Sequence, residues 1–436
     1  MGKLSDATPP SGMPPDEKPP ARFPTSLGMT LVLLGGVHYG YNIAVVGAAL
    51  PALRTSLANL RALEAGTLSS ATLLGAVAGS PLSGLVCSRY GRRFGTVIGE
   101  ACSTAGAIGC TLSSSVASLI AFRVIVGLGV GFCTLAKPIY VRETVCAQHV
   151  ATVQASFAPA VAIGVLAAQT AGHVIASPQW LFLLGAVPPA LLLAVSLLFM
   201  PESPEWLSNR RRALGESKSA LSRPQDAGAS VGTWLHVRIA VWLAVANQLT
   251  GAYPTLVYAP ELVHAAYPAS SPSSVPLLTT FFNFIGACAA VHAMGACRRR
   301  PLVIGALLCE AVCLMYTAYL SFQGAQTGSG ASTLPLALSL SIWCLAYQLG
   351  PGSGYFVLVG DIALPPMDTA VFAIGNSVRY TCEFASSLFF LPAATAFGVW
   401  RVLLFHAMAA LTCATGLVIM LPETNPHFGH HRPMLF

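Results

Sequence analysis

The sequence predicts an all-α integral membrane protein with about twelve transmembrane helices in two related six-helix halves. Of the 436 residues, 54% are hydrophobic and only 9% are charged, and the mean hydropathy is +0.67. A soluble domain carries about 25% charged residues, so this chain has too little charge to cover a water-facing surface. A bilayer core needs about 20 apolar residues per helix. Runs of this kind recur from residue 27 almost to the end of the chain.

These runs divide the chain into five regions. Residues 1–26 are polar and rich in proline and lack an apolar signal core, so we expect a disordered cytosolic tail there. Six-helix bundles are expected at 27–200 and 233–421, with a cytosolic loop at 201–232 and a cytosolic tail at 422–436. The expected helices are 27–47, 67–87, 94–114, 117–139, 152–173, 180–200, 234–258, 275–294, 302–321, 334–359, 370–392 and 400–421.

Lysine and arginine residues predict the orientation. If both termini share one side of the membrane, that side holds sixteen of these residues outside the helices, and the other side holds three. Such an excess marks the cytosolic side. The net charge of +7 is then a consequence of topology, so the expected partner is the lipid bilayer and not nucleic acid. We expect the plasma membrane, with an organelle membrane as the alternative; the oligomeric state is left open.

No pattern in the chain points to a cofactor, a metal or an enzyme. The 12 cysteines are scattered without a Cys-x-x-Cys pair, which argues against a zinc site or a disulfide framework. Phosphate-binding loops, nucleophile elbows and His-Glu-x-x-His motifs are absent from the sequence. Isolated histidines such as His38 are expected to be packed in the interior rather than to bind metal.

A set of charged landmarks occurs once in each half. An arginine pair follows the second helix, an acidic residue follows the fourth, and a Pro-Glu-Ser or Pro-Glu-Thr sequence follows the sixth. Equivalent positions lie 207, 218 and 221 residues apart, and this nearly constant offset indicates an internal duplication. The landmarks are Arg92, Arg93, Glu143 and Glu202 in the first half and Arg299, Arg300, Asp361 and Glu423 in the second.

Two parallel six-helix halves with a solute site between them describe the major-facilitator fold. Charges at cytosolic helix ends can form ion pairs that close one face and break when that face opens. The landmarks are therefore predicted to control the conformation. The alternative is that each charge only anchors a loop in the headgroup layer.

Several longer motifs follow one another along the chain. They are Gly40-Tyr41-Asn42, Arg89-Tyr90-Gly91-Arg92-Arg93, Pro138-x-Tyr140-x2-Glu143, Pro201-Glu202-Ser203-Pro204-Glu205-Trp206-Leu207, Gln248-Leu249-Thr250-Gly251, Gly350-Pro351-Gly352 and Pro422-Glu423-Thr424. Together they resemble the sugar-porter family of the major facilitator superfamily, which includes the facilitative glucose transporters. The resemblance covers the chain from about the first helix to Thr424. It implies a carrier that works by alternating access, with a bend at Gly350, Pro351 and Gly352.

The resemblance also implies a solute site built from amides and aromatic rings. Amide side chains would exchange hydrogen bonds with solute hydroxyl groups, and the rings would stack on the solute. The implied contacts are Asn247, Gln248, Asn283 and Gln348 for the amides, Phe356 and Tyr380 for the rings, and Tyr253 and Asn42 as further contacts. Tyr258 corresponds to an extracellular gate tyrosine of the family. Tyr253 and Arg379 stand where the family has asparagines, which is a departure from its hexose site.

Charged and amide residues inside the expected helices bear on the driving force. The neutral amide of Asn42 cannot exchange a proton, which predicts uniport; packing is the alternative role. Glu100 and Glu310 keep open the alternative of proton coupling. Glu100 lies about 10 Å into the membrane at 1.5 Å per residue, so it could instead reach the interface. Arg379 is expected to pair with Glu383 one turn away, with contact to an anionic solute as the alternative.

The sequence thus favours facilitated diffusion of a sugar, a polyol or a similar small polar solute. One alternative is a proton-coupled or organic-ion carrier of the same superfamily. The other is a nutrient sensor that binds a solute without transporting it.

Overall fold

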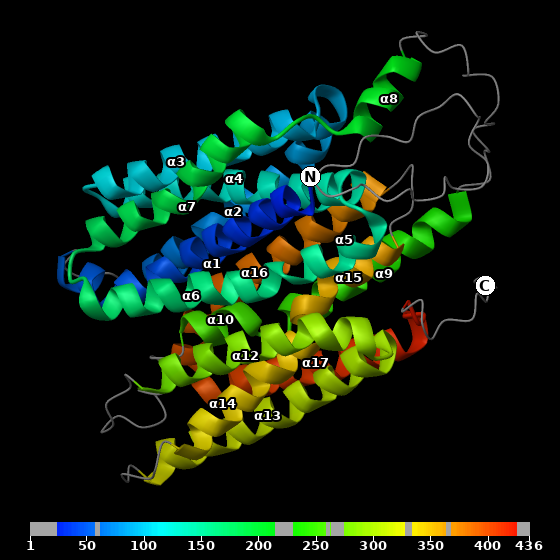
Figure 1. Cartoon of the computed structure of the whole chain (residues 1–436). Helices are drawn as coiled ribbons and strands as arrows, with labels where there is room; N and C mark the ends of the chain where they lie inside the picture. Colours follow the sequence, from blue (N-terminus) through cyan, green and yellow to red (C-terminus); the bar gives the residue numbers. More distant parts are fainter. Residues whose placement is uncertain are drawn as a thin grey trace.

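The structure is a computed structural model that describes residues 24–56, 62–213, 230–258, 262, 274–327, 334–362 and 368–424. Within these ranges the regular secondary structure is helical throughout (Figure 1). Most of the two expected tails and of the central loop lies outside the described residues. The predicted boundaries of these segments therefore stay predictions.

The first half contains seven membrane-region helices and one short helix after them. They are α1 (Thr25–Ser56), α2 (Ala62–Tyr90), α3 (Arg92–Leu112), α4 (Val116–Thr144), α5 (Ala147–Ala155), α6 (Phe157–Val174), α7 (Pro178–Phe199) and α8 (Pro204–Ala213). The helices α5 and α6 together fill the place of the expected span at 152–173. Pro159 lacks the N–H that would bond to the carbonyl of Ala155, which accounts for the interruption between them.

The second half repeats this plan with two broken spans. Its elements are α9 (Ser230–Gln248), α10 (Ala252–Val257), α12 (Ser274–Ala296), α13 (Arg299–Thr327), α14 (Leu334–Tyr347), the π-turn η1 (Gln348–Gly352), α15 (Ser353–Ile362), α16 (Asp368–Phe397) and α17 (Val399–Met420). Gly251, with φ of 81°, separates α9 from α10 in a left-handed conformation that favours glycine. Gly350 departs from helical geometry before Pro351, which confirms the predicted bend.

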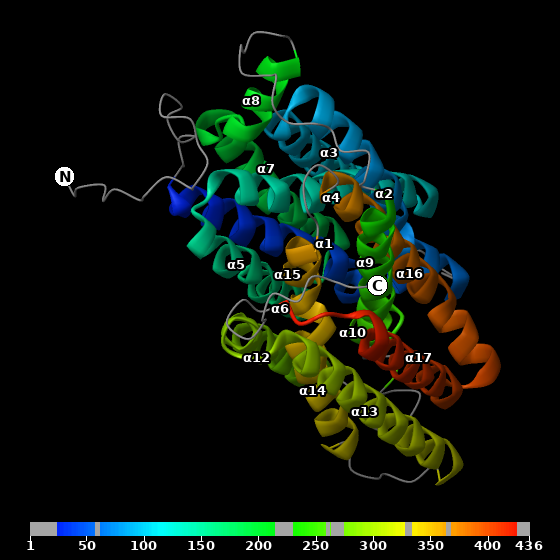
Figure 2. The same ribbon diagram turned by 90° about the vertical axis from the view of Figure 1, so that its right-hand side faces the viewer.

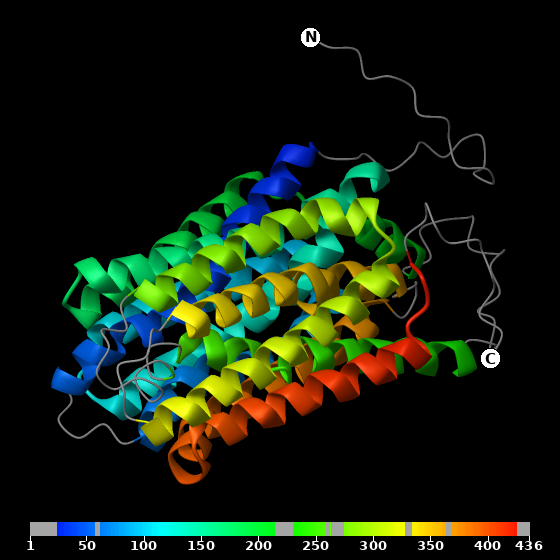
Figure 3. The same cartoon turned by 90° about the horizontal axis from the view of Figure 1, so that it is seen from below.

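Nine of the twelve expected spans are helices or helix pairs long and apolar enough to cross a membrane, counted over the described residues. The other three places are filled by α3, by α9 with α10, and by α16, which run alongside them in the same bundle (Figures 1 and 3). The chain is therefore a multi-pass membrane protein, and the prediction of about twelve spans in an all-α fold is confirmed.

The two halves lie side by side with their helices in roughly the same direction. Figure 2, which looks toward the helix ends, shows α1 to α7 above and α12, α13, α14 and α17 below. The helix α16 packs along α2, and α12 packs along α6, so each half contributes to two long seams between them. The space between these seams contains the cavity described below.

Glycines allow helices of the first half to approach closely. A Cβ atom on Gly127 of α4 would lie 1.9 Å from the carbonyl oxygen of Thr72 on α2, and one on Gly40 of α1 would lie 2.0 Å from that of Val161 on α6. No side chain fits at these distances. In a membrane, where helices associate through packing rather than through the hydrophobic effect, such contacts fix which helices are neighbours.

Candidate functional site

A cavity with about 870 Å³ of empty space, part of it open to solvent, lies between the two halves. The first half contributes side chains from α1, α5 and α6, and the second contributes side chains from α9, α10, α12, α14, η1, α15 and α16. The lining residues include Tyr39, Ile43, Gln154, Phe157, Val161, Asn247, Gln248, Tyr253, Asn283, Tyr347, Gln348, Phe356, Arg379 and Glu383. The wall therefore contains amides, aromatic rings and one pair of opposite charges.

The four predicted amides converge on one wall of this cavity. Gln348 Nε2 donates to Asn283 Oδ1 at 2.9 Å, and Gln248 Nε2 donates to Asn247 Oδ1 at 2.7 Å. All four are nearly buried, with exposed fractions between 3 and 6%. Among the described residues, Gln248 Oε1 and Asn283 Nδ2 have no hydrogen-bond partner. One acceptor and one donor are thus left for a solute.

Breaks in the helices place these amides. Asn247 and Gln248 end α9 just before the left-handed Gly251, and Gln348 begins the π-turn that contains Pro351. Asn247 Nδ2 donates to the carbonyl oxygen of Pro351 at 2.6 Å, so the two breaks are held to each other. Interrupted helices expose backbone and side-chain polar groups at membrane depth only where they face a cavity, as they do here.

The charged landmarks of the first half form one network at the ends of α3 and α4. Arg92 pairs with Glu143 on α4, with Nη2 to Oε1 at 2.7 Å, and its Nη1 donates to the carbonyl of Cys87. The backbone N–H groups of Arg92 and Arg93 donate to Glu202 at 2.8 and 3.2 Å. A carboxylate at a helix N-terminus satisfies free N–H groups and is favoured by the helix dipole.

The second half repeats this network with the equivalent residues, although the arginine uses different nitrogen atoms. Arg299 pairs with Asp361, its Nε donates to the carbonyl of Met294, and the N–H groups of Arg299 and Arg300 donate to Glu423 at 3.0 and 3.3 Å. Each of these bonds has a counterpart in the first half, although the separations along the chain differ: 62 against 51 residues for the arginine–carboxylate pair and 124 against 110 for the bond to the glutamate. The duplication predicted from sequence offsets is therefore present in the side-chain contacts.

That these charges control the conformation stays a prediction. In each network, the bonds described above join elements of the same half. The reason is local: each arginine pair begins a helix whose neighbours in the same half carry the acidic partners. The two networks do occupy the same end of the bundle, since Arg142 of the first half lies close enough to Asp361 to interact electrostatically.

Sequence comparison adds a family to this geometry. A family model described as "Sugar (and other) transporter" matches residues 28–233 and 229–428, nearly the whole chain. This chain belongs to that family of transporters. It is accordingly a membrane carrier and not an enzyme, and the resemblance to sugar porters is confirmed.

Relatives of the transporter include bacterial proteins that align over most of their length. The probable metabolite transport protein CsbC of Bacillus subtilis is 28% identical over 419 residues, which cover 90% of each chain. The glucose transporter GlcP of Staphylococcus epidermidis is 25% identical over 420 residues, which cover 90% of this chain and 93% of GlcP. XylE of E. coli, a proton:xylose symporter solved with 6-bromo-6-deoxy-D-glucose, has the same fold, with a TM-score of 0.78 over 92% of this chain and 98% of that chain at 20% identity.

The family resemblance places two aromatic residues, Phe356 and Tyr380, on the solute, but only the first of them lines the cavity. Phe356 lines the cavity, with its ring 5.4 Å from that of Phe157 across the gap between the halves. Tyr380 does not line it: its side chain is fully buried, its hydroxyl donates to Thr134 Oγ1 at 2.9 Å, and Arg379 covers its ring at 4.1 Å. Stacking of Tyr380 on a solute is therefore incompatible with this conformation.

Asn42 is also outside the cavity wall. Its amide donates to the carbonyl oxygens of His38 at 3.1 Å and of Gly185 on α7 at 3.0 Å. Arg123 Nη1 donates to the backbone carbonyl of Asn42 at 2.8 Å. These bonds support the alternative role of Asn42 in packing. The identity of this residue therefore does not discriminate between uniport and proton-coupled transport.

Tyr253 of α10 joins the halves, whereas the hydrogen bond described for Tyr258, the C-cap residue of α10, lies within the second half. Tyr253 lines the cavity, and its hydroxyl lies 3.2 Å from the carbonyl of Ile43 and 3.1 Å from that of Ser69, both in the first half. The hydroxyl of Tyr258 donates to the carbonyl of Ser387 in its own half, and its ring stacks on Phe390. Tyr253 is thus the better candidate for a gate contact at this end of the cavity.

Arg379 pairs with Glu383 at 3.3 Å, as predicted, and both line the cavity. The hydroxyl of Tyr39 on α1 lies 3.3 Å from Glu383 and 3.4 Å from Arg379 Nη1. The pair therefore also joins the second half to the first. Sequence spacing indicated the ion pair, but Tyr39 carried no signal as its partner.

The expectation that Glu100 reaches the membrane interface is wrong. Its side chain is fully buried and forms an ion pair with Lys137 of α4, a residue that the apolar pattern around it had hidden. His38 lies against the same carboxylate and is not isolated. Glu310, the second carboxylate considered for proton coupling, is also fully buried, and neither of its oxygens has a hydrogen-bond partner within the described residues.

Proposed function

We propose that this transporter carries a neutral polyhydroxylated solute of monosaccharide size, a sugar or a polyol, through the central cavity by alternating access. The convergence of Asn247, Gln248, Asn283 and Gln348 on one wall carries the proposal. Amides both donate and accept hydrogen bonds, as hydroxyl groups do, so a wall of amides suits a solute with many hydroxyls. Gln248 Oε1 and Asn283 Nδ2, which have no hydrogen-bond partner among the described residues, are the first atoms that we assign to contact with the solute.

The opposite wall supports the same solute class. Phe157 and Phe356 offer apolar ring surface, which suits the C–H faces of a sugar ring. Relatives such as the glucose transporter GlcP, and the glucose analogue bound to XylE, agree with this class.

Charge in the cavity favours a neutral solute over an organic ion. Arg379 and Glu383 compensate each other, so the lining residues carry no net charge. The double variant Arg379→Asn/Glu383→Gln removes both charges together and should keep the preference for D-glucose over D-glucuronate in uptake assays. A wild-type preference for the uronate that this variant loses would instead favour the organic-anion carrier.

We further propose the cytosol for both termini, with the tails at 1–26 and 422–436 and the loop at 201–232 on that side, and the plasma membrane as the site of action. The lysine and arginine bias and the location of both arginine networks at one end of the bundle support this orientation. In the proposed cycle each network holds its half rigid while the halves move against each other.

The test is counterflow in proteoliposomes that contain purified protein. Vesicles loaded with an unlabelled sugar are diluted into the same labelled sugar, over a panel of hexoses, pentoses and polyols. We expect saturable exchange of at least one member. Gln348→Leu should reduce it, because the solute loses a hydrogen-bond partner, whereas Gln169→Leu, a buried glutamine of α6 outside the cavity wall, should not.

Absence of exchange for every panel member would defeat the proposed carrier. If a sugar then still raised the melting temperature, the protein would be a solute sensor rather than a transporter.

A further inference from the structure

Four chemically active side chains meet in the interior of the first half, outside the amide site. Lys137 Nζ forms an ion pair with Glu100 Oε1, Cys133 Sγ donates to the same oxygen at 3.1 Å, and His38 Nδ1 lies 3.7 Å from Glu100 Oε2. They come from α3 (Glu100), α4 (Cys133 and Lys137) and α1 (His38). We call this group the Glu100 cluster. Each member is at most 4% exposed, so none of them reaches bulk water in this conformation.

Among the described residues, no ion pair joins the cluster to a further charged side chain. The helix α7, which packs against α3, has no ionisable side chain between Pro178 and Phe199. The helix α2 contributes Cys87, which interacts with Cys133. With a neutral histidine, the carboxylate and the ammonium group compensate each other. One added proton gives the cluster a net charge of +1, whichever group receives it.

Two atoms of the cluster are able to accept that proton. Neither His38 Nε2 nor Glu100 Oε2 has a hydrogen-bond partner among the described residues. When Nδ1 of a neutral imidazole carries its hydrogen and faces a carboxylate, Nε2 is the free acceptor. Among the ordinary side chains, histidine is the one whose unperturbed imidazole changes charge in the physiological range.

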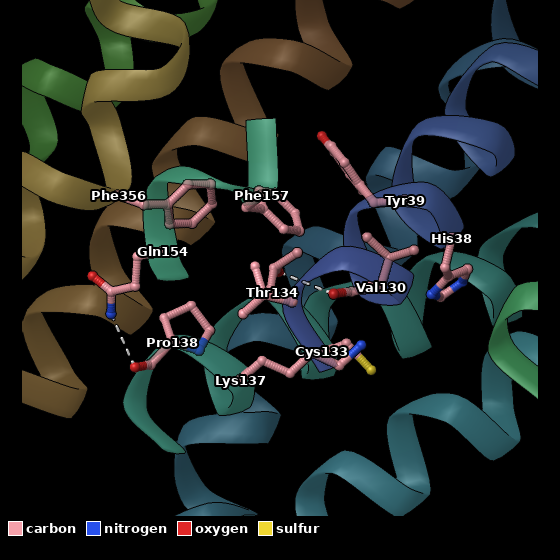
Figure 4. A pocket seen from close by; sticks show the side chains of 12 residues that line it. His38, Tyr39, Val130, Cys133, Thr134, Lys137, Pro138, Gln154, Phe157 and Phe356 are labelled. Carbon is pink, nitrogen blue, oxygen red and sulfur yellow. Dashed lines mark hydrogen bonds between the residues drawn. The ribbon is translucent and has the colours of Figure 1, made fainter. Parts of the chain in front are cut away.

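A side chamber connects the cluster to the solute cavity. Three of its members, His38, Cys133 and Lys137, line a second cavity with about 490 Å³ of empty space (Figure 4). This chamber and the solute cavity share four wall residues, namely Tyr39, Gln154, Phe157 and Phe356. Figure 4 shows Phe157 and Phe356 on one side of the chamber and His38 on the other.

The backbone leaves room for the lysine. A Cβ atom on Gly35 of α1 would lie 2.9 Å from Lys137 Nζ and 3.3 Å from its Cδ, so a side chain there would compete with Lys137 for space. If this position served only for apolar packing, an apolar side chain would suffice in place of Lys137. The contact with Gly35 instead leaves the ammonium group of Lys137 at the edge of the chamber.

We propose that His38, Glu100 and Lys137 form a proton-binding site that couples proton movement to solute transport, which makes this chain a proton-coupled carrier rather than a uniporter. The inference rests on the proposed function. A hydronium ion in the chamber transfers a proton to His38 Nε2, which breaks an O–H bond and forms an N–H bond. The N–H bond later breaks when the proton passes to a water molecule on the other side of the membrane, so the two transfers balance and no oxidation or reduction takes place.

Coupling follows from the charge of the cluster. The dry, closed arrangement disfavours a net buried charge, whereas a conformation that fills the chamber with water accepts it. The two conformations then differ in proton affinity, which is the condition for a ligand to shift a conformational equilibrium. Because the chamber and the solute cavity share one wall, solute binding and water access to the cluster change together, and the coupling between them is reciprocal.

The test compares counterflow with accumulation in the same proteoliposomes, with labelled D-glucose and D-xylose as probes. Counterflow needs exchange of solute but no net proton movement; accumulation above equilibrium needs energy from an inward proton gradient. We expect wild-type protein to show both. The variants His38→Leu and Glu100→Gln/Lys137→Met should keep counterflow and lose accumulation. The double variant removes both charges, because Glu100→Gln alone leaves a buried ammonium group uncompensated.

Glu310→Gln is the matched control, since Glu310, like Glu100, has no exposed surface but lines neither cavity. It should keep both activities. If wild-type protein shows counterflow but no accumulation, the proton site is overturned. The same conclusion follows if accumulation survives in both His38→Leu and Glu100→Gln/Lys137→Met, or if only Glu310→Gln loses it.

A measurement on purified protein separates this proposal from the proposed function. Infrared difference spectra between about pH 8 and about pH 5, the range in which histidine titrates, should contain an imidazole band that His38→Leu removes. If neither sugar shows counterflow, the solute assignment fails while this band still tests the site. Identical spectra for wild type and His38→Leu would overturn the proton site.

Discussion

The side-chain amide of Asn247 donates a hydrogen bond of 2.6 Å to the backbone carbonyl of Pro351. Through this bond the break after α9 is held to the break after α14, although 104 residues separate the two positions. The bond fixes where Gln248 and Gln348, the neighbours of these residues, face the cavity. It therefore links the shape of the solute site to the packing of two interrupted helices.

We predict that Asn247→Leu weakens solute binding and lowers stability. The substitution leaves the Pro351 carbonyl buried without a donor, which costs about 1–3 kcal/mol. The Michaelis constant in counterflow should rise by roughly tenfold if about 1.4 kcal/mol of this loss falls on the bound state. Thermal unfolding and uptake kinetics measure the two effects. Unchanged kinetics with normal folding would show that the two breaks keep their places independently.

The arginine networks should behave as units within each half. In double-mutant cycles on unfolding in detergent, Arg92 and Glu143 should show a coupling free energy of about 1 kcal/mol, as expected for a partly buried, multiply bonded pair. Arg92 and Asp361, in different halves, should show none. A coupling of similar size between the halves would mean that these charges close the face between them after all.

Close helix packing predicts a sharp contrast between two glycines. Gly127→Val should abolish folded protein, because even a Cβ atom there would overlap the Thr72 carbonyl of α2. Gly305→Ala on α13 should be neutral or slightly stabilising, since nothing lies within 4 Å of its Cβ position. Yield of monodisperse protein and its melting temperature report both outcomes. Equal tolerance at the two positions would contradict the α2–α4 contact.

Removal of single hydroxyl groups should distinguish Tyr253 of α10 from Tyr258, which caps that helix. Tyr253→Phe deletes the hydroxyl that faces the Ile43 and Ser69 carbonyls and so weakens the closed contact between the halves by about 1 kcal/mol. That change should shift the conformational equilibrium by roughly fivefold, measured as the rate at which a cysteine introduced in the cavity reacts with a maleimide. Tyr258→Phe is the comparison, because the hydrogen bond described for its hydroxyl is to Ser387 of the same half. A larger effect from Tyr258→Phe would reverse the assignment of the gate.

Patterns repeated along the chain determined most of the fold. Apolar runs located all twelve spans, because a bilayer demands a minimum apolar length. Gly350 and Pro351 marked their break correctly, because a missing N–H interrupts a helix wherever it occurs. The spacing of Arg379 and Glu383 gave their ion pair, since residues four apart share a helix face. The duplicated landmarks gave two equivalent halves, which the matched bonds of Glu202 and Glu423 confirm.

Contacts between distant helices were decided only in three dimensions. The sequence could not show that Tyr380 is covered by Arg379, that Tyr39 joins Glu383 across the halves, or that Lys137 meets Glu100 and His38. Each of these contacts joins two helices whose rotation and depth relative to each other are set by packing. No repeating pattern of residues along the chain encodes that relative placement. For that reason the chain by itself specified a two-part membrane carrier, while tertiary structure determined which polar groups face the solute and which face one another.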